Sequence, residues 1–399
     1  MRTDIARCCV VGGGPAGMML GLLLARQGVD VVVLEKHPDF LRDFRGDTIH
    51  PSTLELIYEL GWIDEFLQLP HSKMYDVAVN IGGKAVTFAD FRRLKVHCPY
   101  IAFMPQWDFL DFLAAKAEAS PRFRLLRSTE MTDLIIEDGR VVGVRASTLD
   151  GPLEVRADLV VAADGRHSTT REQAGLQPIA GSPPIDVLWF RLPRRADDEV
   201  PFFQGGQGAL IAINRTDYWQ LAYAIPTNAY PELRQAGLAE LHRRITALAP
   251  ALHDRIGQID SWDKIHQLTV RVDRLTQWHR PGLLCIGDAA HAMSPAGGVG
   301  VNLAIQDAVA TANILGPILR HRRPEDNDLA LIQDRRERPT RITQAFQTGI
   351  LRDLYPKHLT DDTTEHVPLI FTAFRALPPL RYAMGRFIGL GVRQEHIKH

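Results

Sequence analysis

Three glycines near the N-terminus have the types and spacing to bind a phosphate: Gly12, Gly14 and Gly17, in the stretch CVVGGGPAG. Glycine at these places lets the chain turn sharply, lets its backbone approach a pyrophosphate, and lets a helix pack closely on the strands. A helix that begins at Pro15 would offer free N–H groups and a partial positive charge to that phosphate. The glycine turn by itself does not say which nucleotide is bound.

The elements around this turn narrow the choice. Residues 7–11 and 29–34 are short apolar runs, typical of buried parallel strands, and the helical stretch between them ends at Gly28. The second run ends at Glu35, which is placed to accept hydrogen bonds from ribose hydroxyls. Strand, glycine turn, helix, strand and acid in this order predict a dinucleotide site rather than a purely structural turn.

Two later segments repeat the pattern of a strand that ends in a glycine and an acid. Residues 158–165 read DLVVAADG, in which Asp164 precedes the final glycine. Residues 282–288 read GLLCIGD, in which a glycine precedes Asp288. A second glycine turn, within residues 294–302, then opens a second helix. Alone, Asp164 would more often be a turn former and Asp288 a helix cap. Three such motifs in one chain point instead to a shared cofactor site.

In their order, the motifs GGGPAG, ADGRHS and GDAAHAMSPAGGVGVN resemble those of the single-component FAD-dependent aromatic hydroxylases typified by para-hydroxybenzoate hydroxylase. The resemblance covers residues 1–180 and 265–320 well and the rest loosely. It implies an α/β fold. That fold has a Rossmann-like βαβ FAD-binding domain of the glutathione-reductase type, an inserted and mainly antiparallel β-sheet substrate domain, and a helical C-terminal tail.

The resemblance also implies which residues hold FAD. The first glycine turn and Glu35 would bind the ADP half, and Asp288 the ribityl chain. The second helix dipole would stabilise negative charge on the reduced flavin. Asp164 is also linked to NAD(P)H in this family. The expected cofactor-binding residues are Gly12, Gly14, Pro15, Ala16, Gly17, Glu35, Lys36, Arg45, Gln106, Asp164, Gly287, Asp288, Pro295, Gly298, Gly300, Val301 and Asn302.

The implied reaction is hydroxylation of an aromatic small molecule, phenolic or heteroaromatic. NAD(P)H would reduce the flavin, O2 would add to it, and the flavin hydroperoxide would pass an oxygen to the ring. The protein must position the ring and exclude water. The expected catalytic residues are Pro295, His50 and Tyr223. For His50 a surface position before a helix is the alternative, and for Tyr223 a place in the sheet core. No metal site is expected.

The chain is expected to alternate between two domains. The FAD-binding domain takes residues 1–73, 99–180 and 269–330, and the substrate domain takes a hairpin over 74–98 and the strand-rich segment 181–268. Residues 331–399 form the helical C-terminal region. Within the substrate domain, strands are expected over 187–192, 209–213 and 218–225, followed by a helix-like segment over 231–248.

Composition excludes other classes of function. A formal net charge of -1, with 23% charged residues, argues against nucleic acid as a partner. No apolar run reaches the roughly 20 residues that an integral membrane segment needs. Four scattered cysteines favour buried thiols in a cytoplasmic protein. The expected partners are a small aromatic substrate and O2, with a homodimer left open.

Two rival functions stay open at this point. Residues 223–226, YAIP, weakly echo the W-x-W-x-I-P of tryptophan halogenases, but Leu221 and Tyr223 stand where the tryptophans would be. The second rival is a peripheral-membrane flavoprotein, a reductase or quinone-type hydroxylase, because residues 373–394 place four arginines among apolar residues. A helix that covers the FAD-binding domain is the favoured interpretation of that tail.

Overall fold

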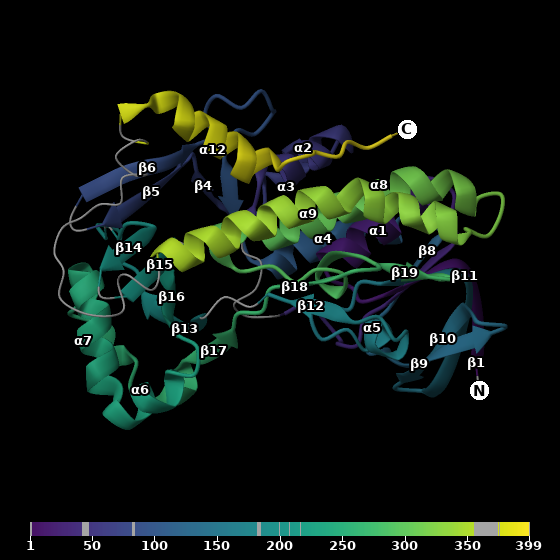
Figure 1. Cartoon of the computed structure of the whole chain (residues 1–399), viewed down its shortest axis with the longest axis horizontal. Helices are drawn as coiled ribbons and strands as arrows, with labels where there is room; N and C mark the ends of the chain where they lie inside the picture. Colours follow the sequence, from purple (N-terminus) through teal and green to yellow (C-terminus); the bar gives the residue numbers. More distant parts are fainter. Residues whose placement is uncertain are drawn as a thin grey trace.

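The computed structural model describes residues 2–41, 48–81, 84–181, 185–198, 200–206, 208–215, 217–354, 374 and 376–398. Two large sheets lie at opposite ends of the molecule, and the long helix α9 (Asp326–Leu354) runs between them (Figure 1). One sheet has eight strands and the other has seven. This arrangement is the α/β fold that the sequence predicted.

The eight-stranded sheet carries the first glycine turn. Its path is β19-β20-β11-β1-β2-β8, and the β9–β10 hairpin is attached to β11. The five strands from β20 to β8 on this path pair in parallel. Strands β2 and β20 and the C-terminal ends of β1 and β11 are buried, which agrees with their apolar sequences. The strands are β1 (Arg2–Val11), β2 (Val31–Leu34), β8 (Phe123–Leu126), β9 (Glu130–Glu137), β10 (Arg140–Thr148), β11 (Gly151–Ala162), β19 (His279–Arg280) and β20 (Leu283–Cys285).

Helices cover this sheet and begin where the sequence suggested. Helix α1 (Pro15–Arg26) begins at the predicted proline, and α8 (Val299–Leu319) follows the second glycine turn and packs against α1. The other helices of this region are α2 (Pro51–Glu59), α3 (Ile63–Phe66), α4 (Gln106–Glu118) and α5 (Thr169–Gln173). Two small sheets, β3 (Thr48–Ile49) with β7 (Ile101–Phe103) and β4 (Ser72–Met74), and β12 (Pro178–Ala180) with β18 (Asp273–Leu275), complete it.

The seven-stranded sheet follows the order β17-β13-β16-β15-β14-β5-β6. The predicted hairpin forms β5 and β6, and β5 joins the sheet by pairing in parallel with β14. Residues far apart in the sequence therefore share one sheet. The strands are β5 (Asp76–Ile81), β6 (Lys84–Asp90), β13 (Ile185–Pro193), β14 (Phe203–Gly206), β15 (Gly208–Asn214), β16 (Tyr218–Pro226) and β17 (His266–Thr269).

The segment 231–248, expected to be helix-like, is helical and divides into two helices. Helix α6 (Tyr230–Ala236) ends and α7 (Leu238–Leu248) begins at Gly237, whose φ of 90° is a conformation that glycine adopts readily. Both helices cover one face of the seven-stranded sheet. Short 3-10 turns occur at Pro250–Leu252, Ile256–Gln258, Trp262–Lys264, Gly287–Ala289 and Ala296–Gly298.

The C-terminal helix α12 (Pro378–Leu390) lies on β6 and α2. Pro378 and Pro379 are the first two residues of this helix, where a missing N–H has no cost. A Cβ at Gly385 would overlap the backbone of Asp90, so glycine permits this close contact. Gly385, Ile388 and Leu390 are buried in this contact. The apolar side of α12 therefore faces the protein, which disfavours the membrane-binding interpretation.

A buried network fastens the C-terminal region to the eight-stranded unit. Asp307 on α8 accepts hydrogen bonds from Gly287 N (3.1 Å), His291 Nε2 (2.6 Å) and Arg336 Nε (2.9 Å). Arg336, on α9, also donates to Glu395 Oε1 (3.4 Å) near the C-terminus. Although burial alone would raise it, His291 and Arg336 hold the pKa of Asp307 below its usual value. The network joins four distant parts of the chain.

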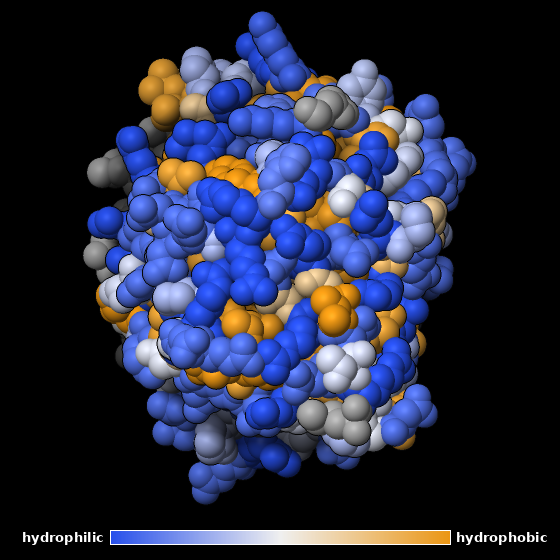
Figure 2. All heavy atoms as spheres, turned by 90° about the vertical axis from the view of Figure 1, so that its right-hand side faces the viewer, coloured by the Kyte–Doolittle hydropathy of each residue, from blue (hydrophilic) through white to orange (hydrophobic). Residues whose placement is uncertain are grey.

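The surface of the protein is mainly hydrophilic. On the face shown in Figure 2, hydrophilic side chains dominate and hydrophobic ones form small separate groups. Within the described ranges, no helix combines the length and apolar character needed to cross a bilayer. All four cysteines are described, buried and unpaired.

We predict that Asp307→Ala lowers the free energy of unfolding by about 3–5 kcal/mol, because the buried Arg336 loses its shorter carboxylate contact and keeps only the 3.4 Å carboxylate contact with Glu395. Urea unfolding of the purified variant measures this loss. The control is Asp260→Ala, which breaks an exposed ion pair with Lys264 and should leave stability nearly unchanged. Equal stability of the two variants would contradict a supporting role for the network.

Candidate active site

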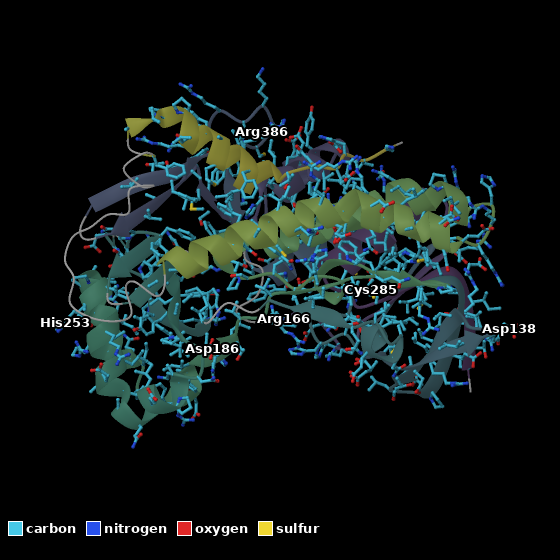
Figure 3. The ribbon with its side chains drawn as sticks, viewed as in Figure 1. Asp138, Arg166, Asp186, His253, Cys285 and Arg386 are labelled. Atoms are coloured by element: carbon cyan, nitrogen blue, oxygen red, sulfur yellow. The ribbon has the colours of Figure 1, made fainter. Side chains whose placement is uncertain are left out.

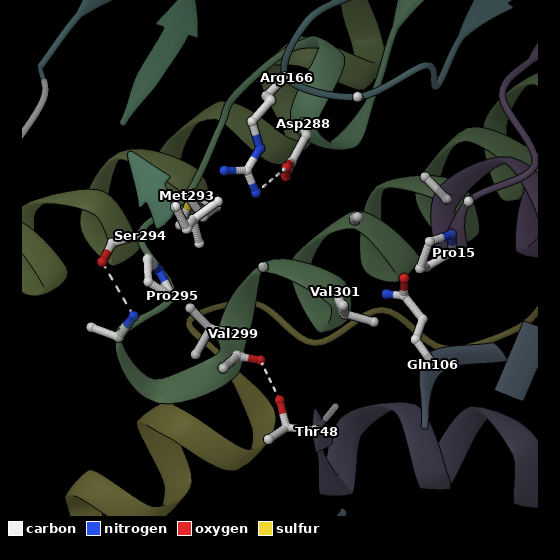
Figure 4. Close-up of a pocket in the computed structure, with 18 of the residues that line it drawn as sticks. Pro15, Thr48, Gln106, Arg166, Asp288, Met293, Ser294, Pro295, Val299 and Val301 are labelled. Atoms are coloured by element: carbon white, nitrogen blue, oxygen red, sulfur yellow. Dashed lines mark hydrogen bonds and ion pairs between the residues drawn. The ribbon is translucent and has the colours of Figure 1, made fainter. Parts of the chain in front are cut away.

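A cavity of about 1090 Å³ lies between the two large sheets, and both contribute to its lining. The N-termini of α1 and α8 face it. In Figure 4, Pro15 and Gln106 lie at one end, and Met293, Ser294 and Pro295 lie at the other. The cavity therefore connects the first glycine turn with the second, and it extends to the inner face of the seven-stranded sheet.

The glycines of the first turn have distinct roles. Gly12 has a φ of 107°, and a Cβ there would overlap Ala163 on the neighbouring strand. A Cβ at Gly17 would overlap the carbonyl oxygen of Gly12, so this glycine allows the helix to pack on the turn. A Cβ at Gly14 would meet no atom within 4 Å, and α1 has no side-chain cap. The open space beside free N–H groups fits a pyrophosphate.

Glu35 and Gln106 lie on the same side of the cavity as this turn. The Glu35 carboxylate accepts hydrogen bonds from Gly13 N and His37 N, both at 3.0 Å, and still lines the cavity. Gln106 is the first residue of α4, and its side chain points toward Pro15 (Figure 4). An acid and an amide thus flank the helix N-terminus, as the ADP half of FAD would require.

Asp164 organises the loop that follows β11. Its carboxylate accepts hydrogen bonds from Ser168 Oγ (2.5 Å) and from Thr170 N and Oγ1 (3.1 and 2.8 Å), so it caps α5. The loop carries Arg166, and its Nη2 lies 3.9 Å from Asp288 Oδ2. Both residues line the cavity. Figure 3 places Arg166 near the centre of the molecule. Arg166 was not singled out from the sequence, although its place in the ADGRHS motif was a signal.

The second glycine turn is held by buried side chains. Gly298 has a φ of 62°, and its carbonyl accepts a hydrogen bond from Thr48 Oγ1 (2.9 Å). Asn302 Oδ1 accepts hydrogen bonds from His50 N (2.8 Å) and Thr53 Oγ1 (2.7 Å), and its Nδ2 donates to the carbonyls of Thr48 and Gly298. The Asn302 amide is therefore occupied in joining α8 to α2.

Most of the predicted cofactor residues come together in this cavity. Those that line it are Gly12, Gly14, Pro15, Ala16, Glu35, Lys36, Gln106, Asp164, Asp288, Pro295, Gly298, Gly300 and Val301. Gly17, Gly287 and Asn302 are not among its lining residues and support the two turns from behind. Arg45 lies outside the described residues.

His50 is neither exposed nor part of the cavity lining. It is fully buried, and its Nδ1 donates a hydrogen bond to the carbonyl of Ile388 on α12 (2.9 Å). Burial lowers its pKa to about 4. Its backbone N–H and its ring thus connect Asn302 with the C-terminal helix. This position supports the second glycine turn and does not support direct contact with a substrate.

Tyr223 faces away from the cavity, so its expected catalytic role needs correction. It is 1% exposed and packs on the α6–α7 side of the seven-stranded sheet. Burial raises the pKa of its phenol. Its neighbours on β16, Ala222 and Ala224, point into the cavity because successive side chains alternate between faces. The core alternative named for this tyrosine agrees with its position.

Apolar side chains form the other wall of the cavity, and the sequence did not identify them as a group. They are Met74, Val77, Val79, Phe88, Ile101, Ile185, Val187, Trp189, Phe202, Phe203, Ile211, Ile213, Ala222, Ala224 and Leu268. Alternation along the strands was the available signal. On α9, Gln347 accepts a hydrogen bond from Ser294 N and donates to the carbonyls of Ser294 and Ala296, which fixes the turn opposite this wall.

Comparisons with known proteins agree with this geometry. The family described as FAD binding domain matches residues 5–346. A 6-methylpretetramide 4-monooxygenase from Streptomyces rimosus is 36% identical over 358 residues, which cover 88% of this chain and 84% of that protein. The chain belongs to the FAD-dependent aromatic monooxygenases.

Solved structures show that this monooxygenase fold is shared widely. The p-nitrophenol 4-monooxygenase of Pseudomonas putida DLL-E4 aligns with a TM-score of 0.78 and 20% identity, over 98% of this chain and all of that one (100%). A myxobacterial chondrochloren halogenase aligns with a TM-score of 0.74 and 22% identity, over 96% of this chain and 90% of that one. At these identities the likeness concerns the fold alone and does not favour a halogenase.

We predict that Gly14→Val lowers FAD affinity at least about tenfold while the protein still folds. The new side chain would enter the open space in front of α1, where a phosphate would lie, and its backbone φ of -73° suits valine. FAD affinity is measured by titrating the apoprotein and following flavin fluorescence. Gly257→Val is the control, because that glycine also has open space but is not among the residues that line the cavity. Equal FAD affinity in both variants would refute this assignment.

We predict that His50 makes the protein less stable as pH falls from 6.5 to 4. The unfolded chain takes up a proton at the ordinary pKa of 6.5, whereas the folded chain does so only near 4. The loss is on the order of 3 kcal/mol across this window. Urea midpoints at several pH values should fall less steeply in His50→Asn, which keeps a good helix cap. Parallel curves for both proteins would rule out this contribution.

Proposed function

We propose that this monooxygenase binds FAD, takes reducing equivalents from NAD(P)H, and uses O2 to hydroxylate a phenolic or heteroaromatic small molecule. The observation that carries the proposal is the lining of the cavity. Two helix N-termini without side-chain caps face its polar part, and an apolar sheet lines the rest. A charged dinucleotide suits the first part, and an aromatic ring suits the second.

The residues of the first part fit FAD. The open space at Gly14 and the N-terminus of α1 would take the pyrophosphate, and Glu35 the ribose. Asp288 would lie beside the ribityl chain, and the backbone from Gly298 to Val301 beside the flavin ring. When bound, FAD would accept a hydride from NAD(P)H and activate O2 for transfer of one oxygen atom to the ring.

The protein's own contribution is position and exclusion of water. Gln347 fixes the Ser294–Ala296 turn by three hydrogen bonds, so the edge of the cavity next to Pro295 keeps its shape. The apolar wall holds a ring against this edge and provides a surface that binds water poorly. Positioning of this kind supplies much of a catalyst's advantage in reactions between two bound partners.

The relatives support the same chemistry. The 36% identical Streptomyces rimosus protein is named for oxygenation of 6-methylpretetramide, and the Pseudomonas putida structure for oxygenation of p-nitrophenol. The direct test is aerobic oxidation of NADH and NADPH by the yellow protein with a panel of phenols and N-heteroaromatics. Peroxide and products are measured in the same reactions. We expect one compound to stimulate oxidation and to gain a single oxygen.

Two other outcomes would contradict the proposal. If neither nicotinamide reduces the flavin, the enzyme takes its electrons elsewhere. If the main product contains chlorine or bromine and depends on added halide, a halogenase is the better description.

We predict that Asp288→Ala lowers the FAD content of the purified protein several-fold and leaves the fold largely intact. The carboxylate lines the cavity and is about one-third exposed, so its loss removes a hydrogen-bond acceptor without opening the core. Flavin absorbance per mole of protein measures the content, and circular dichroism reports on the fold. Asp288→Asn should retain part of the affinity. Unchanged flavin content in Asp288→Ala would show that the ribityl site is elsewhere.

A further inference from the structure

The apolar wall carries information about the substrate. Every described residue of the seven-stranded sheet that lines the cavity is hydrophobic. The cationic side chains among the described lining residues, Lys36 and Arg166, come from the eight-stranded side, and Arg166 faces Asp288. A carboxylate held against the wall would lose its hydration and find no cation from the sheet. Such burial of an unpaired charge is strongly unfavourable, so the wall favours an uncharged ligand.

The centre of the wall is recessed. Ala222 on β16 lies between Trp189 on β13 and Ile211 on β15, and Ala224 lies between Val187 and an alanine. These side chains share one face of the sheet, where positions two residues apart are neighbours. The methyl groups of Ala222, Ala224 and the paired Ala209 therefore form a shallow stretch of about 7 Å along β16, bordered by Trp189, Ile211 and Val187.

The recess lies opposite the second glycine turn. Ala296, from that turn, packs against the same hydrophobic cluster as Ala222 and Ala224. Ala296 is in turn fixed by Gln347. A flat ring system lying in the recess would thus have one face toward the turn that ends at Gly298. Its other face would meet the alanine methyl groups, and Trp189 would stand at one edge.

We propose that Ala222 and Ala224 are specificity-determining residues that admit an uncharged aromatic substrate of two or more fused rings. Larger side chains at these positions would fill the recess and leave space for a single ring. The inference rests on the proposed function, since it assigns the substrate class of that same site. It adds that a carboxylated single-ring phenol is a poor ligand.

Calorimetric titration of the FAD-loaded protein tests the ligand class without turnover. The probes are phenol, 2-naphthol, 2-hydroxyanthracene and 6-hydroxy-2-naphthoate. Each added ring buries more apolar area, so we expect the dissociation constant to fall roughly fivefold to tenfold per ring. The naphthoate should bind at least about tenfold more weakly than 2-naphthol. Tighter binding of phenol than of 2-naphthol, or of the naphthoate than of 2-naphthol, would overturn the inference.

Variants test the two alanines themselves. Ala222→Leu should weaken 2-hydroxyanthracene at least about tenfold and phenol less than about twofold, because the added side chain overfills the recess. Ala222→Val is the milder variant if the first folds poorly. Ala212→Leu is the matched control, because Ala212 is buried in the same sheet on the α6–α7 side. Adding Ile211→Ala beside Ala222→Leu should restore part of the affinity.

The outcomes separate the two proposals. Equal weakening of all probes by Ala222→Leu, or the same pattern in Ala212→Leu, would overturn the role of the recess. FAD content is measured in the same samples. A protein that binds no FAD would refute the proposed function, whereas a yellow protein that prefers single rings or carboxylates would refute the inference alone.

Discussion

The buried carboxylate of Asp307 is the interaction on which the arrangement of the site depends. It binds the backbone of Gly287, the ring of His291 and the guanidinium of Arg336, and all of these groups are removed from water. An unpaired charge at this depth would be strongly unfavourable, so the three partners must meet in one geometry. Asp307 on α8 thereby holds Gly287, the first residue of the third motif. It also holds Arg336 and with it α9, which runs across the molecule. In this place α9 contributes Ala345, Phe346 and Gln347 to the lining of the cavity between the sheets.

Two kinds of glycine shape the polar part of the cavity. Gly12, Gly17 and Gly298 are needed for packing, because a Cβ at each would overlap a neighbouring group. Gly14 differs, since its Cβ would meet only open space. The first kind brings helix ends close to the strands, and the second leaves room in front of them. Together they aim the partial positive charges of two helices at one space.

The two faces of the seven-stranded sheet have different roles. Tyr223 belongs to the face that packs under α6 and α7, and its neighbours Ala222 and Ala224 belong to the face toward the cavity. A shift of one residue in the register of β16 would exchange these faces. The same strand therefore contributes both to the packing under α6 and α7 and to the wall of the cavity. His50 and Asn302 support the second glycine turn through buried hydrogen bonds.

The sequence by itself determined the order of strand, turn and helix at each motif, because local spacing of glycines, acids and valines encodes it. Most of the residues from Gly12 to Val301 that line the polar part of the cavity could therefore be singled out. Only the tertiary structure decided which side chains reach the cavity. His50 lies behind the turn and Tyr223 behind the sheet, while Arg166 lines the cavity, because burial and facing depend on segments hundreds of residues apart. Long-range packing, which no local pattern encodes, determines which of these side chains line the cavity.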